Sequence, residues 1–273
     1  MISRRNFLKG GLVLGGAVML DGFVLEPKDI EVQRVDVRIA GLPPAFNGFT
    51  ICQLTDIHHS PVVSLDYINR VVDKASGLSP DLFALTGDYV DDERRYAAPA
   101  MEAVGRLQAR YGTVAILGNH DYFIGESYST DAIARNRIPL LQNSHMMIRS
   151  GGDALCVAGT RDYLEDRPDA REALKGVPLE VPRVLLAHHP DYSEYLPLDE
   201  RIDLVLSGHT HGGQVRLPYS FAPIVPSSFG QKYSGGLVRN RHTQVYVSRG
   251  VGVSMIPVRF NCPPEITLIR LVA

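Results

Sequence analysis

The sequence predicts an α/β protein built as a four-layer αββα sandwich, in which two mixed β-sheets pack together and helices flank them. Three observations lead to this prediction. In the first half, apolar runs alternate with amphipathic helical patterns about every thirty residues, which is typical of βαβ units. The second half is richer in apolar runs of strand length. A chain of 273 residues can also bury one large core.

The first half supplies an edge strand and three buried strands. Residues 32–39 alternate apolar and polar side chains, as an exposed edge strand does. Apolar runs predict buried strands at residues 49–54, 81–85 and 113–117. Right-handed crossovers between them would place the three loops that follow at the carboxyl edge of one sheet.

Two helices are predicted between these strands. One begins after Ser64, a favourable N-cap residue, and the other covers residues 98–108. The apolar face of the first helix is expected to consist of Leu65, Ile68, Val71 and Val72.

The second half contains six candidate strands and one long segment poor in helix signals. The strands are expected at residues 145–149, 154–158, 183–187, 204–206, 245–247 and 265–271. The helix-poor segment, residues 212–236, contains prolines and aromatic residues. It is either an apolar wall for a lipid or nucleoside moiety, or an ordinary surface loop with a few buried aromatic side chains.

The N-terminus predicts export. Residues 3–9 match the twin-arginine pattern, and the apolar run that follows, residues 10–20, is short for a ~30 Å hydrocarbon layer. We therefore expect a signal in residues 1–25, a folded domain in residues 30–273, and passage through the twin-arginine translocase to the periplasm or cell envelope. An ordinary amphipathic first helix is the weaker alternative. No Ala-x-Ala site precedes a cleavage point, so an uncleaved form anchored in the membrane stays open.

Composition narrows the class of ligand. A net charge of −2 provides no basic field to hold nucleic acid, which favours a small or lipid-borne ligand. The three cysteines, Cys52, Cys156 and Cys262, are widely spaced and form no Cys-x-x-Cys pair. We interpret them as packing residues, with a disulfide as the alternative in an exported protein.

Five short clusters of metal-binding side chains lie at or near the ends of the apolar runs. Imidazole and carboxylate groups bind divalent first-row metals, and several such groups at one sheet edge can hold two cations. The clusters contain Asp56 and His58; Asp88; Asn119, His120 and Asp121; His188 and His189; and His209 and His211.

Each cluster alone also has an ordinary interpretation. Gly87-Asp88 is a common turn, and a histidine in a loop is usually a surface or core residue. Asn119 is an uncommon ligand that avoids adding negative charge next to an anionic substrate. His209 and His211, two apart in an extended segment, would face the same way and address adjacent metals. Histidines delivered by three strand ends favour metal binding over the ordinary interpretation for the set.

Together these motifs resemble those of the calcineurin-like metallophosphoesterases. The family pattern is Asp-x-His, Gly-Asp-x-x-Asp, Gly-Asn-His-Asp/Glu, His, and Gly-His-x-His, and the resemblance runs from about residue 50 to residue 273. Residues 248–265 are similar to a branch of exported or membrane-associated bacterial phosphodiesterases. That branch includes enzymes acting on nucleotide-linked lipid precursors of the cell envelope.

The resemblance implies two divalent metal ions, with manganese, zinc and iron as the candidates, and a role for each matching residue. Asp56, His58 and His211 would hold the first metal; Asn119, His188 and His209 would hold the second; and Asp88 would bridge them. His120 would protonate the leaving oxygen or stabilise the transition state, oriented by Asp91. The pattern His-x-Pro-Asp selects His188 rather than His189.

Two departures from the family pattern concern substrate contacts. His59 replaces the small continuation that is common after Asp-x-His, so it is a candidate to reach the site. Asp92 stands where many relatives have an arginine. Arg161 or Arg249 is the candidate replacement for the missing phosphate contact.

The function expected from the motifs is hydrolysis of phosphate esters. A hydroxide between two cations about 3.5–4 Å apart would attack phosphorus in line. Export favours phosphodiesters or pyrophosphates of envelope or nucleotide-linked lipids as substrates. The alternatives are a phosphomonoesterase of broad specificity, a non-catalytic metal-binding envelope protein and, less well matched, a dinuclear amidohydrolase.

Overall fold

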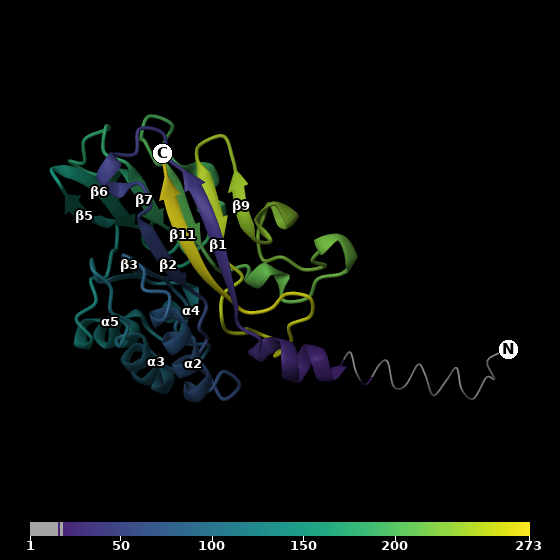
Figure 1. Ribbon diagram of the computed structural model, residues 1–273. Coiled ribbons are helices and arrows are strands. Elements are labelled where there is room, and N and C mark those ends of the chain that lie inside the picture. The colour runs from purple at the N-terminus through teal and green to yellow at the C-terminus, as the bar shows by residue number, and fades with distance from the viewer. Residues whose placement is uncertain (1–15, 17–18) are drawn as a thin grey trace.

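A computed structural model describes residue 16 and residues 19–273, so the twin-arginine motif and most of the apolar run after it lie outside the described residues. Two β-sheets form the centre of the fold (Figure 1). The five-stranded sheet has the order β1-β11-β2-β3-β4, and the six-stranded sheet has the order β5-β6-β7-β8-β10-β9. Both sheets mix parallel and antiparallel pairs, which confirms the predicted fold class.

The strands occupy most of the predicted positions. Those of the first sheet are β1 (Glu31–Arg38), β2 (Thr50–Leu54), β3 (Leu82–Thr86), β4 (Thr113–Ile116) and β11 (Glu265–Val272). Those of the second sheet are β5 (Ser144–Ser150), β6 (Asp153–Gly159), β7 (Arg183–Leu186), β8 (Leu204–Ser207), β9 (Gly236–Arg239) and β10 (Gln244–Val247). As predicted, β1 lies at an edge, and β2, β3 and β4 are parallel neighbours whose carboxyl ends share one edge.

Helices cover the outer face of each sheet to different extents. On the first sheet they are α2 (Leu65–Ser76), α3 (Ala97–Val104), α4 (Asn119–Phe123) and α5 (Glu126–Arg135). The second sheet is covered by the short helix α6 (Ala170–Ala173) and the 3₁₀ turns η5 (Pro190–Tyr195) and η8 (Gly230–Tyr233). Further short elements are η1 (Asp21–Leu25), η2 (Glu26–Lys28), η3 (Pro44–Phe46), η4 (Arg94–Tyr96), η6 (His211–Gly213) and η7 (Pro218–Ser220).

Three apolar layers result from this arrangement. One lies between the first sheet and helices α2 and α3, a second between the two sheets, and a third on the outer face of the second sheet. All three cysteines are buried as free thiols, which confirms their interpretation as packing residues. The described part of the chain contains no helix with the length and apolar character to cross a bilayer. The predicted start of the folded domain at residue 30, after the signal in residues 1–25, stays a prediction.

Two details of the predicted helices were wrong. Leu65 is exposed, and Tyr67 and Ala75 join Ile68 in the buried face instead. The helix expected at residues 98–108 is shorter because Gly105 caps its end, so Leu107 is buried beyond the helix.

Ser64 determines where α2 begins, and its replacement should weaken the fold. The Ser64 hydroxyl accepts a hydrogen bond from the Tyr67 amide at 3.3 Å. We expect Ser64→Ala to lower the free energy of unfolding by about 1 kcal/mol, since an N-cap acceptor is lost. Urea denaturation would measure this loss. Ser64→Asp, which keeps an acceptor, is the control, and equal losses in both variants would contradict the capping role.

Candidate metal centre

The side chains of the five clusters meet where the carboxyl edges of the two sheets face each other. Two loops of the first sheet continue side by side past their strands, since the Asp56 amide donates to the Gly87 carbonyl at 3.0 Å and the His58 amide to the Asp88 carbonyl at 3.1 Å. The second sheet contributes His188 after β7. The sequence therefore assembles in one place side chains that lie more than a hundred positions apart.

The first group of donors surrounds Asp56. Its Oδ1 lies 3.3 Å from Nε2 of His211 and 4.0 Å from Nε2 of His58, and the two imidazole nitrogens are 3.0 Å apart. Nδ1 of His58 contacts the Asp91 carboxylate at 3.2 Å, which directs the Nε2 lone pair of His58 toward His211. Two ring nitrogens facing a buried carboxylate at these distances suit a cation between them.

The second group surrounds His188. Its Nδ1 donates to the Thr86 carbonyl at 2.7 Å, so its Nε2 faces the site, 3.1 Å from Oδ2 of Asp88 in a geometry that makes no hydrogen bond. Nδ1 of His209 lies 3.1 Å from Oδ1 of Asn119. Asp88 also lies 3.5 Å from His58 of the first group, so its carboxylate stands between the two groups.

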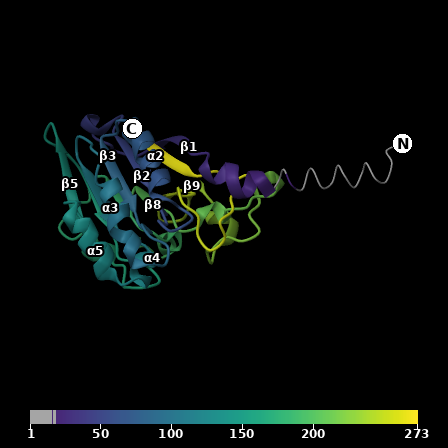
Figure 2. The ribbon, with the colours of Figure 1, turned by 90° about the horizontal axis from the view of Figure 1, so that it is seen from below.

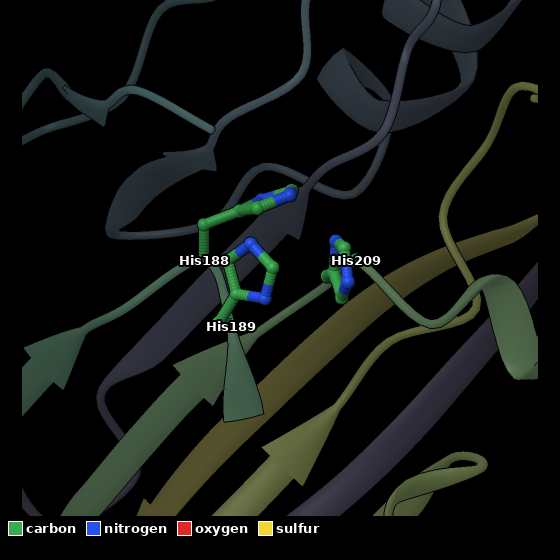
Figure 3. A group of neighbouring side chains, drawn as sticks. All are labelled: His188, His189 and His209. Atoms are coloured by element: carbon green, nitrogen blue, oxygen red, sulfur yellow. The ribbon is translucent and has the colours of Figure 1, made fainter. Parts of the chain in front are cut away.

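His189 also lies at the second group. Its ring is 3.6 Å from that of His209 between centroids, and Figure 3 shows His188 beside this pair. Nε2 of His189 and Oδ2 of Asp162 are both buried without a hydrogen-bond partner among the described residues, 3.5 Å apart. Sequence reasoning set His189 aside and missed Asp162, although Asp162 follows the end of β6 as the other donors follow their strands.

Charge in the site is concentrated on a few groups. Burial opposes charge on His188, but the neighbouring carboxylates, Asp88 first and then Asp56 and Asp162, together outweigh burial and raise the pKa of His188 to about 10. Burial and then the charge of His188 lower the pKa of His209 to about 3. Burial and then the charge of His58 likewise place the pKa of His211 well below its usual value. His209 and His211 are therefore neutral at pH 7, the form that coordinates metal.

The backbone of the site requires glycine at the points of closest approach. A Cβ on Gly118 would lie 2.3 Å from Oδ1 of Asp88, and one on Gly208 would lie 2.1 Å from Oδ2 of Asp56. Asp121 secures the same region from behind, since its carboxylate accepts from the amides of Asp88 and Gly118, each at 2.9 Å. This buttressing by Asp121 was not assigned from the sequence.

The extended conformation expected for residues 209–211 was wrong, and the contact expected between Asp91 and His120 is made through the backbone. His209 and His211 do not lie in an extended segment, since both have left-handed backbone with φ of 65° and 51°, and their rings diverge to different groups for that reason. The Asp91 carboxylate is nearer to His58 than to His120, at 3.2 Å against 3.6 Å. The Asp91 backbone carbonyl lies 2.6 Å from Nδ1 of His120, so Asp91 contacts that ring as expected, but through its backbone.

The candidate phosphate contacts are engaged elsewhere. Arg161 pairs with Asp166 at 2.5 Å, and Arg249 pairs with Glu265 at 2.6 Å. His59 bonds the Tyr96 carbonyl at 3.0 Å. None of these three residues lines the cavity at the site.

A cavity of about 380 Å³ opens onto the site. Asp88, Asn119, His120, His209 and His211 line its floor. Its apolar wall comes from Phe123, Ile224, Pro226 and Met255. A polar floor beneath an apolar wall suits a ligand with an anionic group and a larger apolar part.

Comparisons with known proteins agree with this geometry. Residues 49–213 match the calcineurin-like phosphoesterase family, and residues 1–20 match the twin-arginine translocation signal. The chain is 31% identical to the uncharacterized metallophosphoesterase YkuE of Bacillus subtilis, covering 99% of this chain and 98% of the relative. It is 33% identical to the phosphodiesterase YaeI of Escherichia coli over the full length of both. It spans 61% of a similar zebrafish transmembrane protein with a metallophosphoesterase domain, at 32% identity.

Solved structures share the fold at low sequence identity. The thiohydrolase SoxB of Thermus thermophilus superposes with a TM-score of 0.52 at 14% identity, over 85% of this chain and 57% of SoxB. The NAD nucleotidase of Haemophilus influenzae gives 0.51 at 13%, over 75% of this chain and 45% of that protein. The motifs, the fold and the full-length relatives of the present chain agree with one another. The chain therefore belongs to the calcineurin-like phosphoesterase family, whose members are metal-dependent phosphoester hydrolases.

Proposed function

We propose that this protein is an exported phosphodiesterase that binds two divalent cations and hydrolyses phosphodiesters or pyrophosphates of envelope or nucleotide-linked lipids. The observation that carries the proposal is the convergence of seven donor residues from both sheets on one buried spot. Asp56, His58 and His211 would hold one cation, and Asn119, His188 and His209 the other, with Asp88 shared.

The donor set fits two cations better than it fits a hydrogen-bonded cluster. Nε2 of His188, 3.1 Å from Oδ2 of Asp88, is buried without a hydrogen-bond partner among the described residues. Bound cations would neutralise phosphate oxygens and lower the pKa of a water toward neutrality. Manganese, zinc and iron all accept this mixture of imidazole and carboxylate ligands.

His120 is the residue best placed to act on the leaving group. Its Nδ1 faces the Asp91 carbonyl, which can only accept, so this nitrogen carries a proton and Nε2 is available to the cavity that His120 lines. When doubly protonated, His120 can donate from Nε2 to the departing oxygen. The backbone amide of His120 donates to Oδ1 of Asp88 at 2.9 Å, which holds the backbone of His120 against the shared carboxylate.

The wall of the cavity supports a diester over a monoester. Phe123, Ile224 and Met255 offer apolar surface beside the polar floor, and a second ester substituent has space to lie there. The similarity to a phosphodiesterase over the whole chain agrees with this preference. The twin-arginine signal agrees with a substrate outside the cytoplasm.

Hydrolysis of model substrates tests the proposal. We expect purified protein with Mn²⁺ to cleave bis(p-nitrophenyl) phosphate faster than p-nitrophenyl phosphate, and a chelator to abolish both activities because the cations would be removed. A panel of nucleotide–lipid pyrophosphates would then identify the natural class. Turnover that resists chelation would reject the metal mechanism, and absence of any turnover would favour a non-catalytic envelope protein.

His120→Ala should separate catalysis from metal binding. General-acid groups contribute about 10²–10⁴-fold, so kcat should fall by that factor while the metal content stays unchanged. His242→Ala, in the loop between β9 and β10, is the matched control and should keep full turnover. Full activity in the His120 variant with metal bound would contradict the assigned role.

Gly208→Ala should weaken metal binding without removing any donor. The new Cβ would displace the Asp56 carboxylate, and misplacing a ligand typically weakens metal affinity by about 10–100-fold. Elemental analysis and calorimetric titration with Mn²⁺ would measure the effect. Gly77→Ala, whose Cβ would meet no atom nearer than 3.4 Å, is the control. Equal metal affinity in the two variants would argue against Asp56 as a ligand.

A further inference from the structure

Exposed apolar side chains gather on three segments beside the cavity. Tyr219 and Met255 are almost completely exposed, and Ile224 is 76% exposed. The residues concerned are Met19, Leu20, Phe23, Val24 and Leu25 in the N-terminal segment; Leu217, Tyr219, Phe221 and Ile224 in the 217–224 loop; and Met255 and Ile256 in the 255–256 loop. Contiguous exposed apolar surface of this kind marks an interaction site on a folded protein.

Backbone contacts join the N-terminal segment to the 255–256 loop. The Arg259 amide donates to the Gly22 carbonyl at 2.9 Å, and a Cβ on Gly22 would lie 3.3 Å from Val258. Phe23 and Pro257 line the same surface cleft with Val62, itself 60% exposed. Figure 2 shows the purple N-terminal helix beside the yellow segment near the C-terminus of the chain.

The 255–256 loop in turn contacts the segment that leads into the 217–224 loop. The Gln214 side chain donates to the Ser254 carbonyl at 2.9 Å and accepts from the Ser254 amide at 2.9 Å. Val215 forms a parallel bridge with Phe260. A Cβ on Gly213 would lie 2.5 Å from the Ile224 carbonyl, so the end of the 217–224 loop packs against the segment that leads into it. Direct contacts therefore link the three segments in series.

This surface borders the cavity at the site. Ile224 and Met255 belong to it and also line the cavity above Asp88 and Asn119. The two apolar loops therefore flank the cavity above its polar floor.

The N-terminal segment indicates what covers the surface. Its exposed residues, Met19 to Leu25, continue the apolar run of residues 10–20 that belongs to the export signal. An apolar run in such a signal is suited to a lipid environment. Because the 255–256 loop adjoins this segment and the 217–224 loop adjoins the 255–256 loop, we expect a bilayer that receives the segment also to meet Tyr219, Phe221 and Ile256.

We propose that the 217–224 loop, the 255–256 loop and the N-terminal segment form a lipid-docking surface that seats the opening of the cavity on a bilayer. The inference rests on the proposed function, because it specifies how a lipid-linked phosphodiester reaches the site. The acyl chains stay in the membrane while the phosphate passes between Ile224 and Met255 to the polar floor. Binding follows the buried apolar area, as for other interfacial proteins.

The absence of tryptophan from the sequence allows a direct test. Phe221→Trp and Ile256→Trp each place one tryptophan on the surface in the full-length chain, one on each loop. We expect the emission of both variants to shift to the blue with vesicles of phosphatidylethanolamine and phosphatidylglycerol, and brominated phospholipid to quench it. Leu198→Trp is the matched control, since Leu198 is 73% exposed before β8, at the opposite edge of the sheet. Its emission should stay unchanged.

The outcomes separate this inference from the proposed function. No shift at residues 221 and 256, or an equal shift at residue 198, would overturn the docking surface. A shift that grows with protein concentration without vesicles would assign the surface to a second copy of the chain and overturn it too. Hydrolysis of bis(p-nitrophenyl) phosphate, which needs no membrane, is measured in parallel. Insertion without hydrolysis would reject the proposed function alone, and hydrolysis without insertion would reject the surface alone.

Discussion

The site depends on a backbone constraint: five of the seven proposed ligands adopt left-handed backbone. The φ angles are 52° at Asp56, 49° at His58, 57° at Asp88, 65° at His209 and 51° at His211. Such a conformation costs a non-glycine residue about 1–3 kcal/mol. Five such residues together cost about 5–15 kcal/mol, which is comparable with the whole net stability of a domain. Hydrogen bonds such as that from the His209 amide to Asp56 at 2.9 Å offset part of this cost.

The same turns bring the negative charges of Asp56 and Asp88 together, and positive charge must be present nearby to balance them. Burial raises the pKa of Asp56, and burial would do the same for Asp88 without the charge of His188, which holds the pKa of Asp88 well below its usual value. One protonated imidazole thus stands in for part of the positive charge that two cations would supply. Cation binding would replace that proton, so metal affinity and folding stability are coupled through the same atoms.

Sequence reasoning located the strands, the shared edge and the donor residues because each has a local signal. Apolar runs mark β2, β3 and β4, and parallel order follows from the helices between them. Sequence reasoning missed α5 and β9, because the polar residues 126–135 and the four-residue strand Gly236–Arg239 lack a strong hydrophobic periodicity. It also missed features that depend on packing between distant segments, such as the pairing of Arg249 with Glu265 and the position of Asp162 beside His189.

The segment at residues 212–236 shows why the sequence alone left two interpretations open. Tyr233 is fully buried in the apolar layer on the outer face of the second sheet, as an ordinary loop with buried aromatic residues requires. Tyr219 and Phe221 are exposed, and Ile224 lines the cavity, as an apolar wall requires. One end of the segment thus anchors the loop in the core, and that anchor holds the other end beside the site. Periodicity cannot distinguish the two kinds of aromatic residue, because the difference arises only from which side of the loop meets the sheet.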